Sequence, residues 1–189
     1  MGIVKRTFLV LAALALAAAP AVADEYSDTI GLFKNAGESA AFFGKSYGYA
    51  VFPSIGKAGL GIGGAHGTGR VYEKGVYIGD TKMNQLSIGA QAGAQGFSQM
   101  IFFEDKRSLD EFTSGNFEFG ANVGAVVITA AASGSAGSAG ATGSASAGKK
   151  DASTAAEFHK GMAVFVIAKG GLMYEASIGG QKFSYKAKK

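Results

Sequence analysis

Apolar positions near the start of the chain recur at three- and four-residue steps, which is the period of an α-helix. The pattern covers residues 26–47 and predicts a helix there, with one face made of Tyr26, Ile30, Phe33, Gly37, Ala40 and Gly44. Three glycines interrupt the segment, so we expect a weak or broken helix that depends on packing against the rest of the chain. The following "YGYAVF" predicts a short strand, which Pro53 is expected to end.

After Pro53 the period changes to two, which indicates a β-strand. In "KAGLGIGGAHGTGR" (57–70) the glycines at 59, 61, 63, 67 and 69 share one parity, and the larger side chains share the other. The segment therefore predicts a strand with one nearly bare face. A turn is expected near Lys74 and Gly75, and residues 86–103 predict a second alternating strand.

The remaining chain predicts one more helix and several strands. "SLDEF" opens the helix, with Ser108 and Glu111 in the spacing of a capping box. Strands are expected in "FEFGANVGAVVITA", in a hairpin within "MAVFVIAKGGLMYEASIGG" that turns at residues 169–171, and in "KFSYK". Residues 131–156 are rich in Ala, Gly and Ser and lack bulky apolar side chains, so they predict a flexible loop.

The first 23 residues have the composition of a secretory signal peptide. Lys5 and Arg6 precede a short apolar run that ends in Ala-Val-Ala. A retained membrane anchor is the alternative, but a span needs about 20 apolar residues and this run is shorter. We expect one domain over residues 24–189, with a net charge near +2 once the two basic residues of the leader are removed. A charge this small predicts no nucleic-acid partner.

Two glycine-rich motifs resemble nucleotide-binding loops, and neither has the required context. The match to G-x-G-x-x-G at Gly59, Gly61 and Gly64 is followed by more strand pattern rather than by a helix. "GSASAGKK" (143–150) has Lys150 where a P-loop has Ser or Thr, and no strand precedes it. We therefore predict no nucleotide cofactor.

His66 and His159 are the only histidines, and the chain has no cysteine. Zinc needs three or four nitrogen, sulfur or oxygen ligands, so no metal site is predicted. No nucleophile motif frames a catalytic serine. We predict a protein that is not an enzyme, and a hydrolase using either histidine remains the lowest-ranked hypothesis.

The glycines are better explained by architecture. A bare strand face lets another group lie directly on the backbone and lets the sheet bend sharply. We expect an α+β fold with short helices packed on a strongly curved, glycine-rich antiparallel β-sheet or small barrel. Aromatic side chains could fill it, from Phe42, Phe43, Phe52, Phe97, Phe102 and Phe103. A groove shallow enough for an acyl chain is the other use of such glycines.

Basic residues flank the glycine strand and crowd the end of the chain, with aromatic residues near them. Cations beside interfacial aromatics can contact lipid headgroups. The candidate lipid-binding residues are Lys57, Arg70, Lys74, Lys182 and Lys186. Ordinary solvated lysines on strand faces are the alternative.

The order of these segments resembles the SYLF domain over about residues 42–185. The matching pieces are "YAVFPSIGKAGLGIGGAHGTGRVY", "IGAQAGAQGFSQMIFF", "EDKRSLDEF", "FEFGANVGAVV" and "VFVIAKGGLMYEASIGG". The resemblance assigns structural motif positions to Phe52, Pro53, Gly59, Gly61, Gly63, Gly64, Gln91 and Gly170, and counts Lys57 among its matches. The loop at 131–148 departs from the family pattern and is similar to an insertion.

The resemblance implies a lipid-binding domain. Eukaryotic relatives bind phosphoinositide-containing membranes, and some bind and bundle actin. An exported protein would not meet actin, so we do not extend that activity to this chain. The prediction is a phospholipid-binding module of the bacterial cell envelope, in the periplasm, at the outer-membrane periphery or secreted. A structural or protein-interaction module of the envelope is the alternative.

Overall fold

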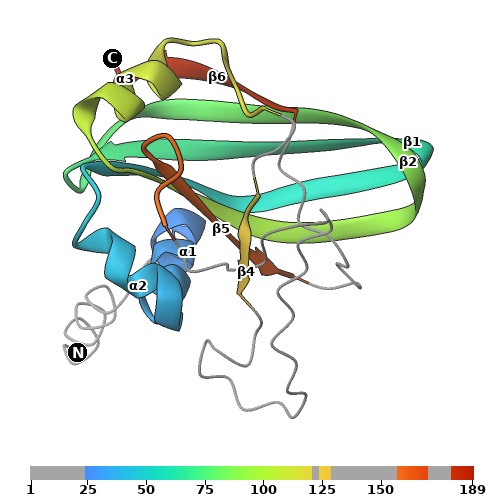
Figure 1. Ribbon diagram of the computed structural model, residues 1–189, viewed down its shortest axis with the longest axis horizontal. Coiled ribbons are helices and arrows are strands. Elements are labelled where there is room, and N and C mark those ends of the chain that lie inside the picture. Colours follow the sequence, from blue (N-terminus) through green and yellow to red (C-terminus); the bar gives the residue numbers. More distant parts are fainter. Residues whose placement is uncertain (1–23, 121–123, 129–156, 170–179) are drawn as a thin grey trace, which may run out of the picture.

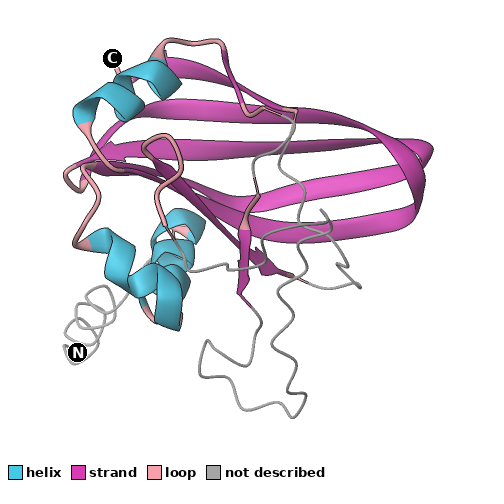
Figure 2. Ribbon diagram, viewed as in Figure 1, coloured by secondary structure: helices cyan, strands magenta, loops and turns pink. Residues whose placement is uncertain are grey.

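The computed structural model describes residues 24–120, 124–128, 157–169 and 180–189 (Figures 1 and 2). Within the long strands, the side chains of residues 60, 61 and 87–93 also fall outside the description. The predicted leader, the predicted loop at 131–156, Gly170 and the second arm of the hairpin predicted after residue 171 lie outside the described residues.

The first predicted helix forms as two pieces, α1 (Glu25–Lys34) and α2 (Gly37–Phe43). The break falls at Asn35 and Ala36, directly before Gly37. The Ser39 hydroxyl donates to the carbonyl oxygens of Phe33 and Ala36, at 2.6 and 2.9 Å. This confirms the expected broken helix, and Ser39 fixes the corner between its halves.

Two very long strands, β1 (Gly48–Glu73) and β2 (Val76–Phe103), form an antiparallel hairpin. Lys74 and Gly75 make the turn with positive φ values of 48° and 82°. Positive φ at both central residues is the geometry that matches the twist of a two-residue hairpin. The predicted turn is confirmed.

Pro53 does not end the first strand, contrary to the sequence prediction. β1 continues through it with a register shift between Phe52 and Ile55. Such a bulge accommodates a residue that has no N–H to donate. The buried Ser98 hydroxyl donates to the Pro53 carbonyl oxygen at 2.7 Å, which ties the bulge to β2.

The hairpin curls back on itself near the middle of both strands, at a second register shift between Leu60 and Ile62 (Figure 1). Both strands therefore pass through two leaves of one sheet. The open leaf contains residues 62–73 of β1 and 76–86 of β2, with β6 (Gln181–Ala187) beside β2 and β3 (Phe117–Glu118) beside β6. The covered leaf contains residues 48–59 of β1 and 94–103 of β2, with β5 (Met162–Ala168) beside β2 and β4 (Val126–Ile128) beside β5.

The strand pairings make the fold a strongly curled half-barrel with helices against it, as the predicted α+β class requires. Every described pairing is antiparallel except that of β4 with β5, which is parallel. The single strand predicted over residues 117–130 is wrong: its start forms β3 in one leaf and its later part forms β4 in the other. Its two ends therefore pair with strands on opposite sides of the curl.

Helices α1 and α2 pack on the outer face of the covered leaf. Their Phe33, Ala36 and Phe42 join one apolar cluster with Val51, Met100, Phe102, Ile128, Ala163, Phe165 and Ile167. The inner face of the same leaf belongs to a second cluster. A strand buried on both faces reads as a continuous apolar run, which explains "MAVFVIA" in β5.

The inner face of the curled sheet forms the main core. Phe52, Phe97 and Phe103 lie in it, together with Phe183 of β6 and two side chains of α3 (Lys106–Thr113), Leu109 and Phe112. Of the aromatics expected inside, Phe42, Phe43 and Phe102 instead belong to the cluster under α1 and α2. They fill the space between helices and sheet rather than the inside of the curl.

Helix α3 begins one turn earlier than the sequence predicted. Asp105 is the N-cap, and its carboxylate accepts the backbone N–H of Ser108 at 2.8 Å. The Ser108 side chain faces the backbone N–H of Asp105, which completes a capping box of these two residues. The predicted box of Ser108 and Glu111 is therefore wrong, because Ser108 takes the third helical position rather than the cap.

Candidate functional site

The outer face of the open leaf is a sheet surface with cations spaced along it. Strand register places the side chains in three rows, each crossing β1, β2 and β6. The rows are His66–Asn84–Lys182, Thr68–Lys82–Ser184 and Arg70–Asp80–Lys186. Opposed residues of neighbouring strands point to the same side of a sheet. The three rows therefore form one continuous face, and α1 reaches it at Arg70.

The lysines of this face are exposed and mostly unpaired. Lys182 lies 3.5 Å from the Glu118 carboxylate, with side chains 70% and 50% exposed. Lys82 and Lys186 form no ion pair within the described part of the chain. The Asp80 carboxylate, which lies between Arg70 and Lys186 in its row, accepts a hydrogen bond from the Tyr77 hydroxyl at 2.7 Å. The face therefore presents net positive charge to solvent.

Apolar side chains continue the same face toward the bend. Ile62 is 65% exposed and Leu86 is 75% exposed. They occupy diagonal positions of the β1–β2 pair, because Leu86 pairs with Gly64 and Ile62 lies two residues before Gly64 in β1. Two large exposed aliphatic side chains therefore lie next to the basic rows on the same face.

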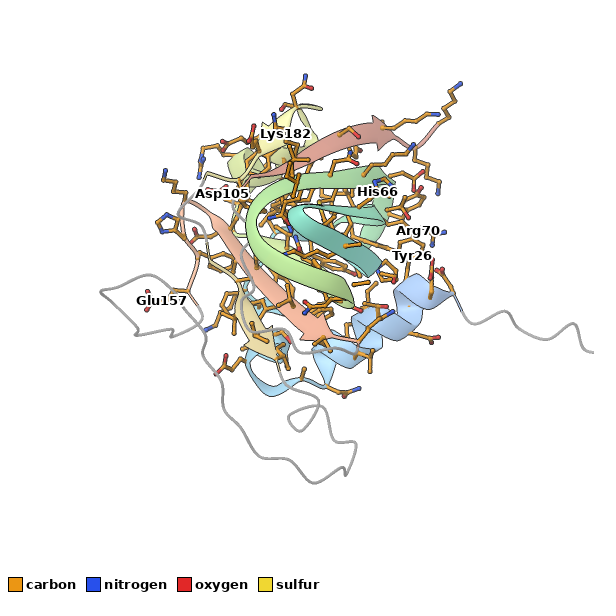
Figure 3. The ribbon with its side chains drawn as sticks, turned by 90° about the vertical axis from the view of Figure 1, so that its right-hand side faces the viewer. Tyr26, His66, Arg70, Asp105, Glu157 and Lys182 are labelled. Carbon is orange, nitrogen blue, oxygen red and sulfur yellow. The ribbon has the colours of Figure 1, made fainter. Side chains whose placement is uncertain are left out.

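Arg70 is committed to contacts within the protein. Its guanidinium lies 2.8 Å from the Asp24 carboxylate and 4.0 Å from the centre of the Tyr26 ring (Figure 3). Burial lowers the pKa of Arg70, but the Tyr72 hydroxyl and the Asp24 carboxylate raise it overall. Arg70 thus holds the start of α1 against the edge of the open leaf.

Tyr77 lies between two cations at the end of this face. Arg70 lies 5.3 Å and Lys188 5.0 Å from its ring centre. The hydrogen bond to Asp80 raises the pKa of Tyr77, because the phenol must keep its proton to donate. Cation–π attraction to this one ring holds Arg70 and Lys188 near each other at the C-terminal end of β6.

The other two predicted cations lie elsewhere. Lys74 is in the hairpin turn, 4.9 Å from the ring centre of Tyr47, whose hydroxyl donates to Glu73. Lys57 lines a groove near the bend, between the two halves of β1. The structure therefore brings Arg70, Lys182 and Lys186 together on one face, and places Lys57 near the bend and Lys74 in the turn of the hairpin.

Sequence reasoning missed three residues of this face: Lys82, Ile62 and Leu86. Each lies on an even position of its strand. The alternation that places the odd-numbered glycines on the inner face also assigns even positions to the outer face, so it could have identified these residues. The predicted alternating segments end at residue 80 and resume at residue 86, so Lys82 falls between them.

The motif positions have structural roles where the structure describes them. Phe52 is fully buried, and Pro53 lies in the bulge. A Cβ on Gly59 would collide with Gly63, so these glycines allow the close approach at the bend. Gly61 and Gln91 lie within β1 and β2, but the Gln91 side chain is outside the description.

Neither histidine lies in a catalytic or metal-binding group that the described residues reveal. His66 Nδ1 lies 2.8 Å from the Asn84 side-chain oxygen on the outer face, and His159 precedes β5. Across residues 24–120, 124–128, 157–169 and 180–189 no cluster of metal-ligating side chains occurs. None of the helices in those ranges is long and apolar enough to cross a bilayer.

Comparison with known proteins identifies a family and a relative of this chain. The Ysc84 family model, described as "Las17-binding protein actin regulator", matches residues 84–188. Beta cell expansion factor A of Aeromonas veronii is 32% identical over 158 residues, which cover 82% of this chain and 51% of that protein. The chain thus spans about half the length of this relative.

Proposed function

Because the chain belongs to the Ysc84 family, whose SYLF domain is a binding module, we propose that it binds anionic phospholipid surfaces without catalysing a reaction. The outer face of the open leaf is the proposed contact surface. The observation that carries the proposal is the set of exposed lysines at 82, 182 and 186 with Ile62 and Leu86 beside them.

Charge supplies the first part of the binding free energy. A lysine close to an anionic membrane surface contributes about 1 kcal/mol, and this contribution falls as salt screens it. Lys82 and Lys186 carry no internal ion pair within the described chain, so a membrane would not have to displace one. Lys182 would exchange an exposed contact with Glu118, which is weak in water.

Apolar contact supplies the second part. Ile62 and Leu86 already expose most of their surface to water. Burying an aliphatic side chain of this size contributes about 1.5 to 3 kcal/mol. The proposed pose therefore places the bend against the acyl boundary and the lysine rows against the headgroups.

We propose that this binding takes place in the cell envelope of a bacterium. Residues 1–23 have the composition of a secretory leader, and the relative from Aeromonas veronii is bacterial. Periplasm, outer-membrane periphery and the extracellular space all remain within the proposal. N-terminal sequencing of the protein recovered from each fraction would test the export step.

The decisive experiment is vesicle co-sedimentation with the purified protein. Vesicles of neutral phospholipid would be compared with anionic vesicles that contain phosphatidylglycerol, each at low and at high salt. We expect anionic vesicles to bind the wild type, and the Lys82→Ala, Lys182→Ala, Lys186→Ala triple variant to bind at least about tenfold more weakly at low salt. Ile62→Ser with Leu86→Ser should remove the binding that survives high salt.

A matched control removes the same charge elsewhere. Lys34, Lys45 and Lys106 are exposed, lie on or beside the helices and belong to none of the three rows, so their triple alanine variant should bind within about twofold of the wild type. Equal weakening in both triple variants would show that net charge rather than this face matters. Binding to no vesicle at all would refute the proposal and favour a protein partner.

A further inference from the structure

A second, separate feature lies where the two halves of β1 diverge before the bend. A groove of about 390 Å³ runs there, lined by Gly56, Lys57, Ala58, Gly64, Ala65, His66, Ala94 and Gln95. Small-molecule sites occupy about 300 to 1,000 Å³, so the groove has room for a small ligand. It shares His66 with the rows of the outer face but none of their lysines.

Lys57 points toward the inside of the curl. On the same parity, Ile55 is fully buried, and Gly59 packs so closely on Gly63 that a Cβ would collide there. The residues of opposite parity, Gly56 and Ala58, face outward and are exposed. Because strand side chains alternate, Lys57 directs its ammonium to the concave side.

This inward lysine has no internal counter-ion. Lys57 is half-buried, and no carboxylate of the described chain lies within ion-pair distance of it. An anionic ligand in the groove would therefore meet this ammonium without a competing carboxylate, and a charge-assisted hydrogen bond could form. The groove therefore contains the unpaired ammonium group of Lys57.

The lining selects the rest of the ligand. Apart from Lys57, His66 and Gln95 it consists of glycine and alanine, and the His66 ring points to the outer face, where it contacts Asn84. Glycine and alanine leave the backbone accessible and offer no pocket that could recognise a bulky or branched shape. A thin, unbranched apolar group fits such a lining best.

We propose that this groove binds a single acyl chain that carries an acid group, with the free fatty acid as its ligand class. The carboxylate pairs with the Lys57 ammonium, and the chain lies along the backbone of Gly64, Ala58 and Ala94. A charge-assisted hydrogen bond fixes the head, and burial of methylene groups provides the remaining affinity.

The proposal is tested by displacement of a fluorescent fatty acid from the purified protein. Laurate should displace the probe, whereas dodecanol, with the same chain and no acid, should do so at least about tenfold more weakly. Inorganic phosphate should not displace it, and lysophosphatidylglycerol would show whether a larger anionic head is also accepted. Displacement by phosphate alone would identify an anion site and overturn the acyl assignment.

Variants separate the two parts of the site. Lys57→Met keeps the side-chain length and removes the charge, so it should weaken laurate at least about tenfold and leave dodecanol unchanged. Lys57→Arg should restore most of the loss.

Lys82→Ala is the matched control, because it removes one lysine from the outer face and leaves the groove intact. It should bind laurate as the wild type does. Unchanged laurate binding in Lys57→Met, with an unchanged melting temperature, would overturn the proposal. Vesicle binding by that same variant would persist, so failure here is distinguishable from failure of the membrane proposal.

Discussion

The ring of Phe52 lies directly on the backbone of Gly69, across the fold of a single strand. A Cβ added to Gly69 would lie 2.7 Å from Phe52 Cδ1 and 2.7 Å from the carbonyl oxygen of Val51. Both residues belong to β1 and are 17 positions apart. The bare face of the glycine strand is therefore occupied by the first half of the same strand.

Substitution of Gly69 tests this contact. Gly69→Ala should lower the free energy of unfolding by about 1 to 3 kcal/mol, because the added methyl meets backbone and a packed ring, neither of which can move freely. Urea unfolding followed by far-UV circular dichroism measures the change. Gly56→Ala is the control, since a Cβ there meets nothing within 4 Å and should change stability by less than about 0.5 kcal/mol. Equal effects at the two positions would contradict the packing argument.

Gln99 and Gln181 form a buried amide pair between β2 and β6. Each donates to the other's side-chain oxygen, at 2.9 and 3.1 Å, and both are fully buried. Gln99→Leu should destabilise the protein by about 1 to 3 kcal/mol because it leaves the Gln181 amide without its partner. Adding Gln181→Leu should recover much of that loss. A thermal double-mutant cycle measures the coupling, and simple additivity would contradict it.

Asp105 should make α3 sensitive to acid. The backbone N–H of Ser108 lowers the pKa of Asp105 below its ordinary value of 3.8. A carboxyl with a lowered pKa in the folded state stabilises the fold above its unfolded pKa, and this contribution is lost as pH falls through the folded value. Asp105→Ala should therefore lower the melting temperature at pH 6, and its difference from the wild type should shrink below pH 3.8.

Asp110→Ala controls for loss of a carboxylate on the same helix. Asp110 forms an exposed ion pair with Lys106 and caps nothing, so its removal should matter much less. Melting curves between pH 2.5 and 6 would compare the three proteins. A gap between wild type and Asp105→Ala that stays constant over this range would show that the carboxylate charge does not contribute.

Replacement of Arg70 should loosen the attachment of α1 to the sheet. Arg70→Ala removes an exposed ion pair and a cation–π contact, which together contribute about 1 kcal/mol. Hydrogen exchange at residues 25–34 should accelerate, while exchange in β5 should not. Lys186→Ala removes a cation from the same row and should leave α1 unchanged. Slow exchange at α1 in Arg70→Ala would show that other contacts hold the helix.

Much of the hairpin could be predicted from the sequence because its two faces differ sharply. Glycine and large side chains alternate over residues 59–70, so period alone identifies the inner and outer faces. Lys74 and Gly75 are residues that suit a two-residue turn, and they stand between two alternating segments. The same rules placed Lys182 and Lys186 on a strand.

The curl and its consequences could not be predicted in this way. Pairing of β2 with β6 joins residues about 100 positions apart, and no local pattern encodes such a contact. The Pro53 prediction failed for a related reason, since its bulge is held by Ser98. Arg70 was a candidate lipid contact, because nothing in the sequence relates it to Asp24, 46 positions earlier.

The close approach of the two halves of β1 also bears on aggregation. Within the described chain this strand is hydrogen-bonded to β2 on one side only, and such an edge normally invites pairing with another molecule. Here it is shielded by its own other half: a Cβ on Gly67 would lie 3.1 Å from the Ser54 carbonyl oxygen, and one on Gly48 would lie 2.5 Å from that of Tyr72. Larger side chains at these glycines would separate the two halves and expose the edge, so their first visible effect in a cell is expected to be insoluble protein.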